Sequence, residues 1–317
     1  MHRIAAAAIA VFMTTPAFAL ECHEGFRAFV HGEGETCIPV QPERIIATRG
    51  DSVATPLIDI GAPLVAVAYR TADDGSLWLR GASDIFGDDA VAALNLANVG
   101  SPNGVDLEAV VSARPDLIVI TEFQTDLIPQ LSEIAPVIVT SRQMTYFEHL
   151  SMLADAAGMA DVFTEREQAY RDRIAEAQSR IGDPSAIKVS QLNISEGVIE
   201  YFPNFGALTQ VVRDIGLGQP QMQADAATAL RDISMEQVNE FDGDIILSSF
   251  APRFDQSIEW MMTERFDGAS PVWRSLSGVQ SGNHFWYERD LWGGTSFASL
   301  HAAIDGLELL TAGRTFQ

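Results

Sequence analysis

Short apolar runs alternate along most of this chain with segments in which apolar residues recur at helical spacing. In the first half, four runs are expected to be strands, at residues 44–48, 64–68, 117–120 and 137–140. Helices are expected between them, over 51–60, around Glu108 and over 127–134. The alternation restarts at 188–194 and ends with a helix over 296–310. Strands that alternate with amphipathic helices predict an α/β fold built in layers.

The two halves of the chain contain nearly the same pattern. One copy is centred on Glu108 and the other on Glu236, and each Glu follows an apolar residue and precedes a Val by two positions. An Asp eight positions after each Glu opens an apolar run. The tripeptide Asp-Ile-Gly lies upstream of each copy, at 59–61 and 214–216. A duplicated helix-then-strand unit predicts two similar α/β lobes with a cleft between them.

A long amphipathic helix is expected between the two copies. Its apolar stripe comprises Phe163, Tyr170, Ile174, Ala177 and Ile181. The segment 164–167 has the form of a capping box, and 182–184 ends the helix. Roughly eighteen residues at 1.5 Å each reach about 27 Å, which is enough to join two lobes. An ordinary surface helix would show the same stripe, but the position between the repeats favours a connector.

This organisation predicts an N-terminal lobe over 20–145, a connecting helical segment over 146–183 and a C-terminal lobe over 184–317. A polar, Gly-containing segment at 71–98 is long enough to carry function.

The first 19 residues are expected to be a signal peptide. Arg3 supplies a positive charge, 4–13 is apolar, and 17–19 reads Ala-Phe-Ala, the form of a cleavage site. The mature chain is therefore expected to start at Leu20 and to be exported into an oxidising compartment. A lipid anchor on Cys22 is disfavoured, because the residue before it, Glu21, is large and charged.

Cys22 and Cys37 are expected to form a disulfide in such an oxidising compartment. Closing a loop of this size stabilises a fold by about 3 kcal/mol. The expected role is to tie down the N-terminus, without any part in catalysis.

The formal net charge of −23 excludes nucleic acid as a general partner, since phosphate binding needs a basic surface. The chain has one Lys, Lys188, so nearly every positive side chain is an Arg. Motifs of hydrolases, nucleotide-binding loops and zinc proteases are absent from the sequence. Nothing in it therefore nominates an enzyme, and no cofactor is expected.

Several segments, in this order and spacing, resemble the periplasmic substrate-binding proteins of ABC importers for iron-siderophores, haem and cobalamin. The segments that carry the resemblance are Pro42–Ala47, Val99–Ile120, Leu131–Val137, Gly206–Pro220, Ser270–Trp273 and Asp290–Trp292. The Cys-closed segment before Pro42 is more similar to the iron-siderophore branch than to the shorter haem or cobalamin binders.

The resemblance implies a fold of two α/β lobes joined by one long, rigid helix, with the ligand held in the cleft between them. It also implies that Glu108 and Glu236, one on each lobe, dock on Arg residues of the inner-membrane permease. A Glu at a helix start is usually solvated or complements the helix dipole, but the duplicated placement favours docking.

Loops at the carboxyl ends of strands form the ligand sites of such lobes. Four arginines follow expected strands, directly or within a few residues: Arg49, Arg70, Arg142 and Arg253. Aromatic walls are expected from Trp78, Tyr146, Tyr201, Phe205 and Trp292. Arg80, in the segment 71–98, could reach the cleft or only solvent. Any one Arg could equally pair with a surface acid.

A guanidinium offers planar, paired donors to carboxylate or catecholate oxygens at any relevant pH. The expected ligand is therefore an anionic ferric siderophore that holds the iron itself, so that no protein metal ligand is required. The chain is expected to act as a monomer. A haem or cobalamin binder of the same fold remains an alternative, and an exported two-lobed hydrolase is a further one.

Overall fold

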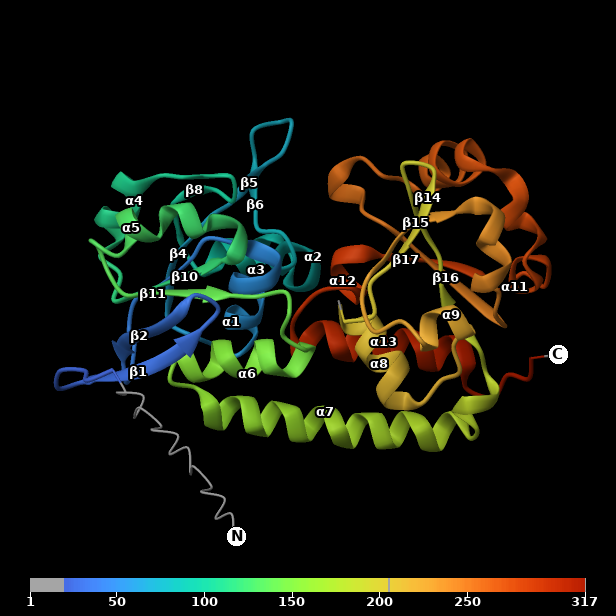
Figure 1. Ribbon diagram of the computed structural model, residues 1–317, viewed down its shortest axis with the longest axis horizontal. Helices are drawn as coiled ribbons and strands as arrows, with labels where there is room; N and C mark the ends of the chain where they lie inside the picture. Colours follow the sequence, from blue (N-terminus) through green and yellow to red (C-terminus); the bar gives the residue numbers. More distant parts are fainter. Residues whose placement is uncertain (1–19, 205, 317) are drawn as a thin grey trace, which may run out of the picture.

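A computed structural model describes residues 20–204 and 206–316. Two lobes lie side by side, and the long helix α7 (Ala160–Ile181) runs beneath both (Figure 1). The predicted fold of two α/β lobes joined by a long helix is confirmed. The expected signal peptide, residues 1–19, lies outside the described residues.

The N-terminal lobe is built on a five-stranded parallel sheet. Its strand order is β11 (Val137–Thr140), β10 (Leu117–Thr121), β3 (Ile45–Ala47), β4 (Leu64–Val67) and β7 (Ala97–Asn98). Alternate residues enter different core clusters, since Ile45 and Ala47 pack in one and Ile46 in the other. Strands covered on both faces are expected to be continuously apolar, and this explains the short runs in the sequence.

The other elements of this lobe surround the sheet. The short strands are β1 (Phe26–His31), β2 (Gly34–Pro39), β5 (Arg70–Thr71), β6 (Leu77–Trp78), β8 (Gly100–Ser101) and β9 (Gly104–Val105). The helices are η1 (Gly50–Ala54), α1 (Thr55–Asp59), α2 (Ala82–Phe86), α3 (Asp88–Ala93), α4 (Leu107–Ala113), η2 (Glu122–Leu127) and α5 (Ile128–Leu131). The segment 71–98 is thus mostly short helices and strands.

The C-terminal lobe combines two small sheets. One is parallel, in the order β12 (Val189–Gln191), β16 (Ile245–Phe250) and β17 (His284–Glu288). The other is antiparallel, in the order β13 (Asn193–Ser195), β14 (Val198–Tyr201) and β15 (Leu230–Ser234). Its shorter helices are η3 (Pro184–Ala186), α8 (Ala207–Ile215), α9 (Gln221–Ala224), η4 (Met235–Phe241), η5 (Pro252–Phe254), α10 (Ile258–Trp260), η6 (Met261–Asp267), η7 (Pro271–Ser275), α11 (Ser277–Gln280) and α12 (Arg289–Trp292).

The Asp of each sequence repeat accepts hydrogen bonds from backbone amides at the start of the neighbouring strand in its lobe. Asp116, before β10, accepts hydrogen bonds from the amides of Glu43 and Arg44 at 2.7 and 2.9 Å, just before β3. Asp244, before β16, accepts one from the amide of Lys188 at 2.7 Å, just before β12. In both lobes the carboxylate therefore aligns the starts of two neighbouring parallel strands.

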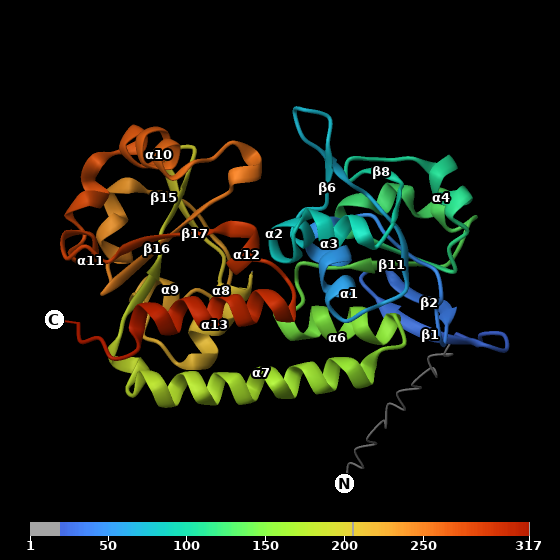
Figure 2. The same ribbon diagram turned by 180° about the vertical axis from the view of Figure 1, so that it is seen from behind.

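Three helices join the lobes: α6 (Tyr146–Ala156), α7 and α13 (Phe297–Thr311). The last of these runs between the C-terminal lobe and α7 (Figure 2). Arg173 of α7 pairs with Asp305 and Glu308 of α13 at 2.7 and 2.6 Å. The capping box expected at 164–167 is wrong, because α7 begins earlier and the Thr164 hydroxyl donates to the carbonyl of Ala160 at 3.0 Å.

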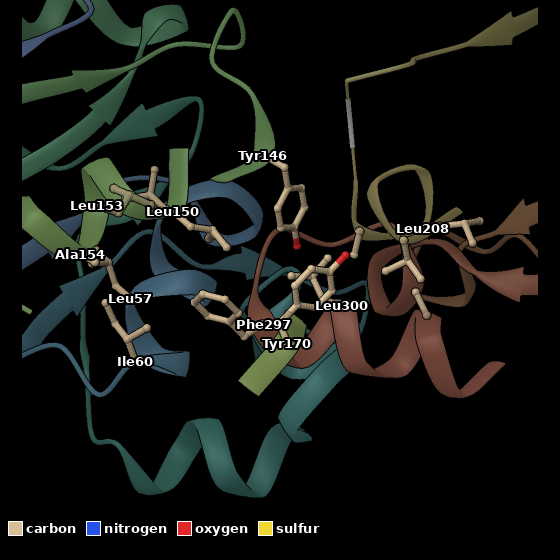
Figure 3. Close-up of a cluster of buried hydrophobic side chains, with 14 of the residues drawn as sticks. Leu57, Ile60, Tyr146, Leu150, Leu153, Ala154, Tyr170, Leu208, Phe297 and Leu300 are labelled. Carbon is tan, nitrogen blue, oxygen red and sulfur yellow. The ribbon is translucent and has the colours of Figure 1, made fainter. Parts of the chain in front are cut away.

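A single hydrophobic core crosses the base of the molecule (Figure 3). Leu57 of α1 and Leu150 of α6 lie in the same cluster as Leu208 of α8 and Phe297 and Leu300 of α13. All five are almost fully buried. Separating the lobes at this end would expose apolar surface, which is unfavourable in water.

The predicted disulfide between Cys22 and Cys37 is present and ties the N-terminus to β2. The hairpin of β1 and β2 adjoins edge strand β11, where the amide of Gly32 donates to the carbonyl of Val139 at 3.0 Å. Across residues 20–204 and 206–316, no helix is both long and apolar enough to span a membrane.

Candidate functional site

A cavity of about 690 Å³ is lined by residues of both lobes. Among the described residues, its lining contains five arginines: Arg49, Arg80, Arg142, Arg231 and Arg289. The lining carboxylates are Asp51 and Glu122, which leaves a formal excess of three positive charges. This excess arises in a chain whose net charge is −23, so the cavity is suited to an anionic ligand.

The carboxyl ends of the parallel strands supply the N-terminal side of the cavity. Arg49 follows β3, Glu122 and Phe123 follow β10, and Arg142 follows β11. Neighbouring parallel strands end at one edge of a sheet, so side chains placed just after them meet there. The structure therefore brings together Arg49 and Arg142, two of the four arginines predicted from the sequence.

Arg49 and Arg80 lie deep in the cavity and share one carboxylate. Asp51, on the π-helical turn η1, accepts from Arg49 at 3.2 Å and from Arg80 at 2.9 Å. Gly81 has φ +83°, and a Cβ there would lie 2.7 Å from the Thr55 hydroxyl oxygen. The glycine thus lets the loop that carries Arg80 approach η1 closely.

Arg80 also crosses to the other lobe, where its guanidinium meets Asp290 of α12 at 2.8 Å. Burial by itself would lower the pKa of Arg80, but Asp51 and Asp290 outweigh it and raise that pKa. Burial would raise the pKa of Asp290, and Arg80 instead holds it below its usual range. The guanidinium is therefore a permanently charged link between the lobes.

Arg253, predicted to bind ligand, is not among the lining residues of the cavity. Its guanidinium reaches from the C-terminal lobe to Asp84 at 2.7 Å and Asp88 at 3.0 Å in the N-terminal lobe. With Arg80 and Asp290 these residues form an interlobe wall (Arg80, Asp84, Asp88, Arg253 and Asp290). Helices α2 and α12, which carry part of it, face each other across the lobes (Figure 1).

Arg70 and Trp78 also lie beside this wall and do not line the cavity. The Arg70 guanidinium lies 5.3 Å from the ring centre of Phe254, and Trp78 packs edge-on against the same ring at 5.4 Å. Burial and the charge of Arg80 lower the pKa of Arg70. Arg70 and Trp78 thus both contact Phe254 of η5, beside the ion pairs that join the lobes.

The predicted aromatic residues serve mainly as packing. Tyr146 touches the cavity, but its hydroxyl accepts from the Ser296 amide at 2.8 Å and donates towards carbonyl oxygens of Ser296 and Gly294. Burial raises the pKa of this hydroxyl. Tyr201 is buried and accepts from Gln219 at 3.1 Å. Trp292 stacks on Tyr287 at 5.6 Å and does not line the cavity, and Phe205 lies outside the described residues.

The arginines and phenylalanines of the lining include residues that were not predicted: Arg231, Arg289, Phe123 and Phe202. Phe123 comes two residues after β10, so the rule that selected Arg142 would have found it if applied to aromatic side chains. Arg289 lies in a short helix after β17, and Arg231 lies within β15. Arg80, left undecided between cleft and solvent, lines the cavity.

Within residues 20–204 and 206–316, no group of three or more His, Cys, Asp or Glu side chains is arranged so that it could hold a metal ion. The arrangement can bind an anion through guanidinium donors and aromatic faces.

Residues 52–285 match the family model described as periplasmic binding protein. The Fe(3+)-citrate-binding protein YfmC of Bacillus subtilis is 24% identical over 269 residues, which covers 82% of this chain and 78% of that protein.

Solved structures share the fold. The FhuD protein from S. pseudintermedius superposes with a TM-score of 0.69 at 20% identity, over 91% of this chain and 99% of that chain. The structure of Staphylococcus aureus SirA complexed with staphyloferrin B superposes with a TM-score of 0.71 at 17% identity, over 90% of this chain and 98% of that chain.

Proposed function

The chain belongs to the periplasmic binding protein family, and we propose that it captures an anionic ferric siderophore and delivers it to an ABC importer for iron uptake. Proteins of this family bind and hand over a substrate without converting it. The ligand would lie in the interlobe cavity, and the siderophore would supply all the ligands of the iron.

The cationic cavity is the observation that carries this proposal. Five arginines from both lobes converge on it, although acids outnumber bases by 23 in the whole chain. Guanidinium groups bind planar oxygen anions through paired hydrogen bonds. The relatives named for ferric citrate and crystallised with staphyloferrin B support an iron-siderophore ligand.

A tryptophan-fluorescence titration of the mature protein tests the ligand class. The probes are ferric citrate, ferric enterobactin (a tris-catecholate), ferrioxamine B, haem and cobalamin. We expect saturable quenching by at least one anionic ferric complex. Quenching by haem or cobalamin alone would show that the proposed ligand is wrong. If none of the five probes quenches the fluorescence, the proposal is rejected.

Arg49→Ala tests whether the cavity is where the ligand binds. Because Arg49 lines the cavity, the variant should bind the anionic ferric complex at least tenfold more weakly, about 1.4 kcal/mol. Arg166→Ala, an exposed arginine of α7 outside the lining, is the matched control and should bind like the wild type. Equal affinity of both variants would place the ligand elsewhere.

Delivery would use Glu108 and Glu236 as docking residues for the permease. Both are exposed in the first turn of a helix, Glu108 in α4 and Glu236 in η4, and they lie on different lobes. Asp106 and Ser234 cap these helices, accepting from the amides of Glu108 and Glu236 at 3.0 and 3.3 Å.

The double variant Glu108→Ala with Glu236→Ala should keep its affinity for the ferric complex and lose most uptake in a transport assay. Glu133→Ala with Glu240→Ala, two exposed acids also split between the lobes, is the control. Normal transport by the first variant would reject the docking role. Export by the 1–19 segment and a monomeric state complete the proposal, and size-exclusion chromatography checks the latter.

A further inference from the structure

Two similar contacts face the cavity, one from each lobe. In the N-terminal lobe the guanidinium carbon of Arg142 lies 4.9 Å from the ring centre of Phe123, and in the C-terminal lobe that of Arg231 lies 4.9 Å from the ring centre of Phe202. All four residues line the cavity. We call these pairs the rim stacks (Phe123 with Arg142, Phe202 with Arg231), because Phe123, Arg142 and Arg231 are exposed residues of the lining.

We propose that the rim stacks act as a paired clamp, each binding one planar anionic oxygen group of a single ligand that bridges the lobes. The groups that fit are carboxylates and catecholates. The inference rests on the proposed function and goes further, because it assigns discrimination between siderophore classes to four named residues at the rim of the cavity.

Parallel register builds the stack of the N-terminal lobe. Strands β10 and β11 pair with Thr121 opposite Thr140, and Phe123 and Arg142 each lie two residues further on. The amide of Arg142 donates to the Glu122 carboxylate at 3.1 Å, which holds the two strand exits together. The stack is therefore a direct continuation of the sheet.

An antiparallel pair builds the other stack. Strands β14 and β15 pair with Tyr201 opposite Leu230. Because the strands run in opposite directions, Phe202 and Arg231 are diagonal neighbours across this pair, a separation that an aromatic and a long side chain can bridge. The carbonyl of Pro203 accepts a hydrogen bond from Arg213 of α8, so the backbone after Phe202 is anchored. Two unrelated strand arrangements thus arrive at the same contact.

Arginine geometry explains why a stacked guanidinium suits such a group. The ring covers one face of the guanidinium and restrains its plane, while the N–H groups along its edges can still donate to oxygens in that plane. The Arg231 side chain is 54% exposed, and its nearest carboxylate, Glu200, lies 3.8 Å away. Phe123 is 58% exposed, so its stack is accessible from solvent as well.

The inner arginines are less available for recognition. Arg49 and Arg80 are only 20% and 18% exposed, and both already donate to Asp51. Their charge favours anions in general. The rim stacks add paired donors for a planar, negatively charged oxygen group, and a ferric tris-hydroxamate without free carboxylates has no net negative charge to offer them.

The test compares Arg142→Ala, Arg231→Ala and the double variant with Arg→Lys and Phe→Leu variants at the same stacks. Each Arg→Ala change should weaken binding of ferric citrate or ferric enterobactin about tenfold, and the double change about a hundredfold. Lys keeps the charge but loses the planar fork, so it should restore less than half of the lost binding free energy. Phe123→Leu and Phe202→Leu should weaken binding about threefold.

The probes separate the two sources of the anionic group. A loss confined to ferric citrate assigns the clamp to carboxylates, and a loss confined to ferric enterobactin assigns it to catecholates. Ferrioxamine B, a hydroxamate complex, should bind every variant as it binds the wild type. Equal losses for ferrioxamine B, or full recovery in the Lys variants, would reduce the stacks to a general charge effect and overturn the inference.

The paired clamp and the proposed function can be rejected separately. If the wild-type protein binds none of the ferric complexes, both hypotheses are rejected. A wild type that binds an anionic complex, with rim-stack variants of unchanged affinity, removes the clamp alone. Urea unfolding of each variant shows that an affinity change does not come from a damaged fold.

Discussion

Arginines occupy two neighbouring regions of the cleft and behave differently in each. In the interlobe wall, Arg80 and Arg253 are held by aspartates of the opposite lobe at 2.7 to 3.0 Å. In the rim stacks, Arg142 and Arg231 lie on phenylalanine rings and face the cavity. Arginine side chains therefore join the lobes in one region and line the cavity beside aromatic rings in the other.

Exposure explains the difference. Asp84 and Asp290 of the wall are 2% and 10% exposed at the side chain, so a guanidinium brought beside them must be paired. Unpaired charge in such surroundings costs several kcal/mol. At the rim, the Arg231 side chain is 54% exposed, so water solvates its charge and the contact to Glu200 at 3.8 Å is not required to offset burial.

The largest expected effect comes from breaking the wall. Arg80→Ala removes the guanidinium that Asp51 and Asp290 share, leaving them only the longer contacts to Arg49 at 3.2 Å and Arg289 at 3.1 Å, and should lower the free energy of unfolding by about 3 kcal/mol. Urea denaturation measures it. Arg180→Ala on α7, an exposed arginine in surface ion pairs, is the control and should cost less than about 1 kcal/mol. Similar losses in both would show that the wall is no stronger than a surface pair.

Asp290→Asn should cost about 2 kcal/mol at pH 7, because it removes the charge of one of the two carboxylates that pair with Arg80. Asp290 has a lowered pKa in the folded protein, so its stabilisation is complete above the usual carboxyl pKa of about 4. It is lost as the pH falls through the lowered value. The unfolding free energies of variant and wild type should therefore converge in acid, and a constant difference would contradict the pairing.

An uncharged interlobe contact should contribute less. Tyr146→Phe removes the hydroxyl that accepts from the buried Ser296 amide, and should cost about 1 kcal/mol in urea denaturation. Tyr201→Phe, whose hydroxyl pairs within one lobe with Gln219, is the control and should cost less. The reverse order would mean that this link between the lobes adds little.

The smallest effect on stability is expected at the rim. Arg231→Ala should change the free energy of unfolding by less than about 1 kcal/mol, because the lost cation–π contact is exposed. Its effect should appear in ligand affinity. If urea denaturation instead shows a loss as large as that of Arg80→Ala, the distinction between rim and wall fails.

Patterns local in the sequence predicted the architecture well. Apolar runs of buried parallel strands, the duplicated Glu and Asp positions and the stripe of α7 each depend on residues close together in the chain. The aspartates of the two repeats align strands in the same way, and the connecting helix lies where the stripe placed it. The ends of the expected strands also predicted that Arg49 and Arg142 lie at the same edge of the sheet, since the carboxyl ends of parallel strands all lie at one edge.

These local patterns could not predict which side chain each arginine contacts. Arg253 follows its strand much as Arg142 follows its own, yet Arg253 meets Asp84 and Asp88, about 165 residues away in the chain, and Arg142 meets Phe123. Sequence alone determined two α/β lobes, their connector and a set of arginines near a cleft. Only the packing of one lobe against the other decided which arginines pair with carboxylates of the opposite lobe, because ion pairing depends on distance in space and not on separation along the chain.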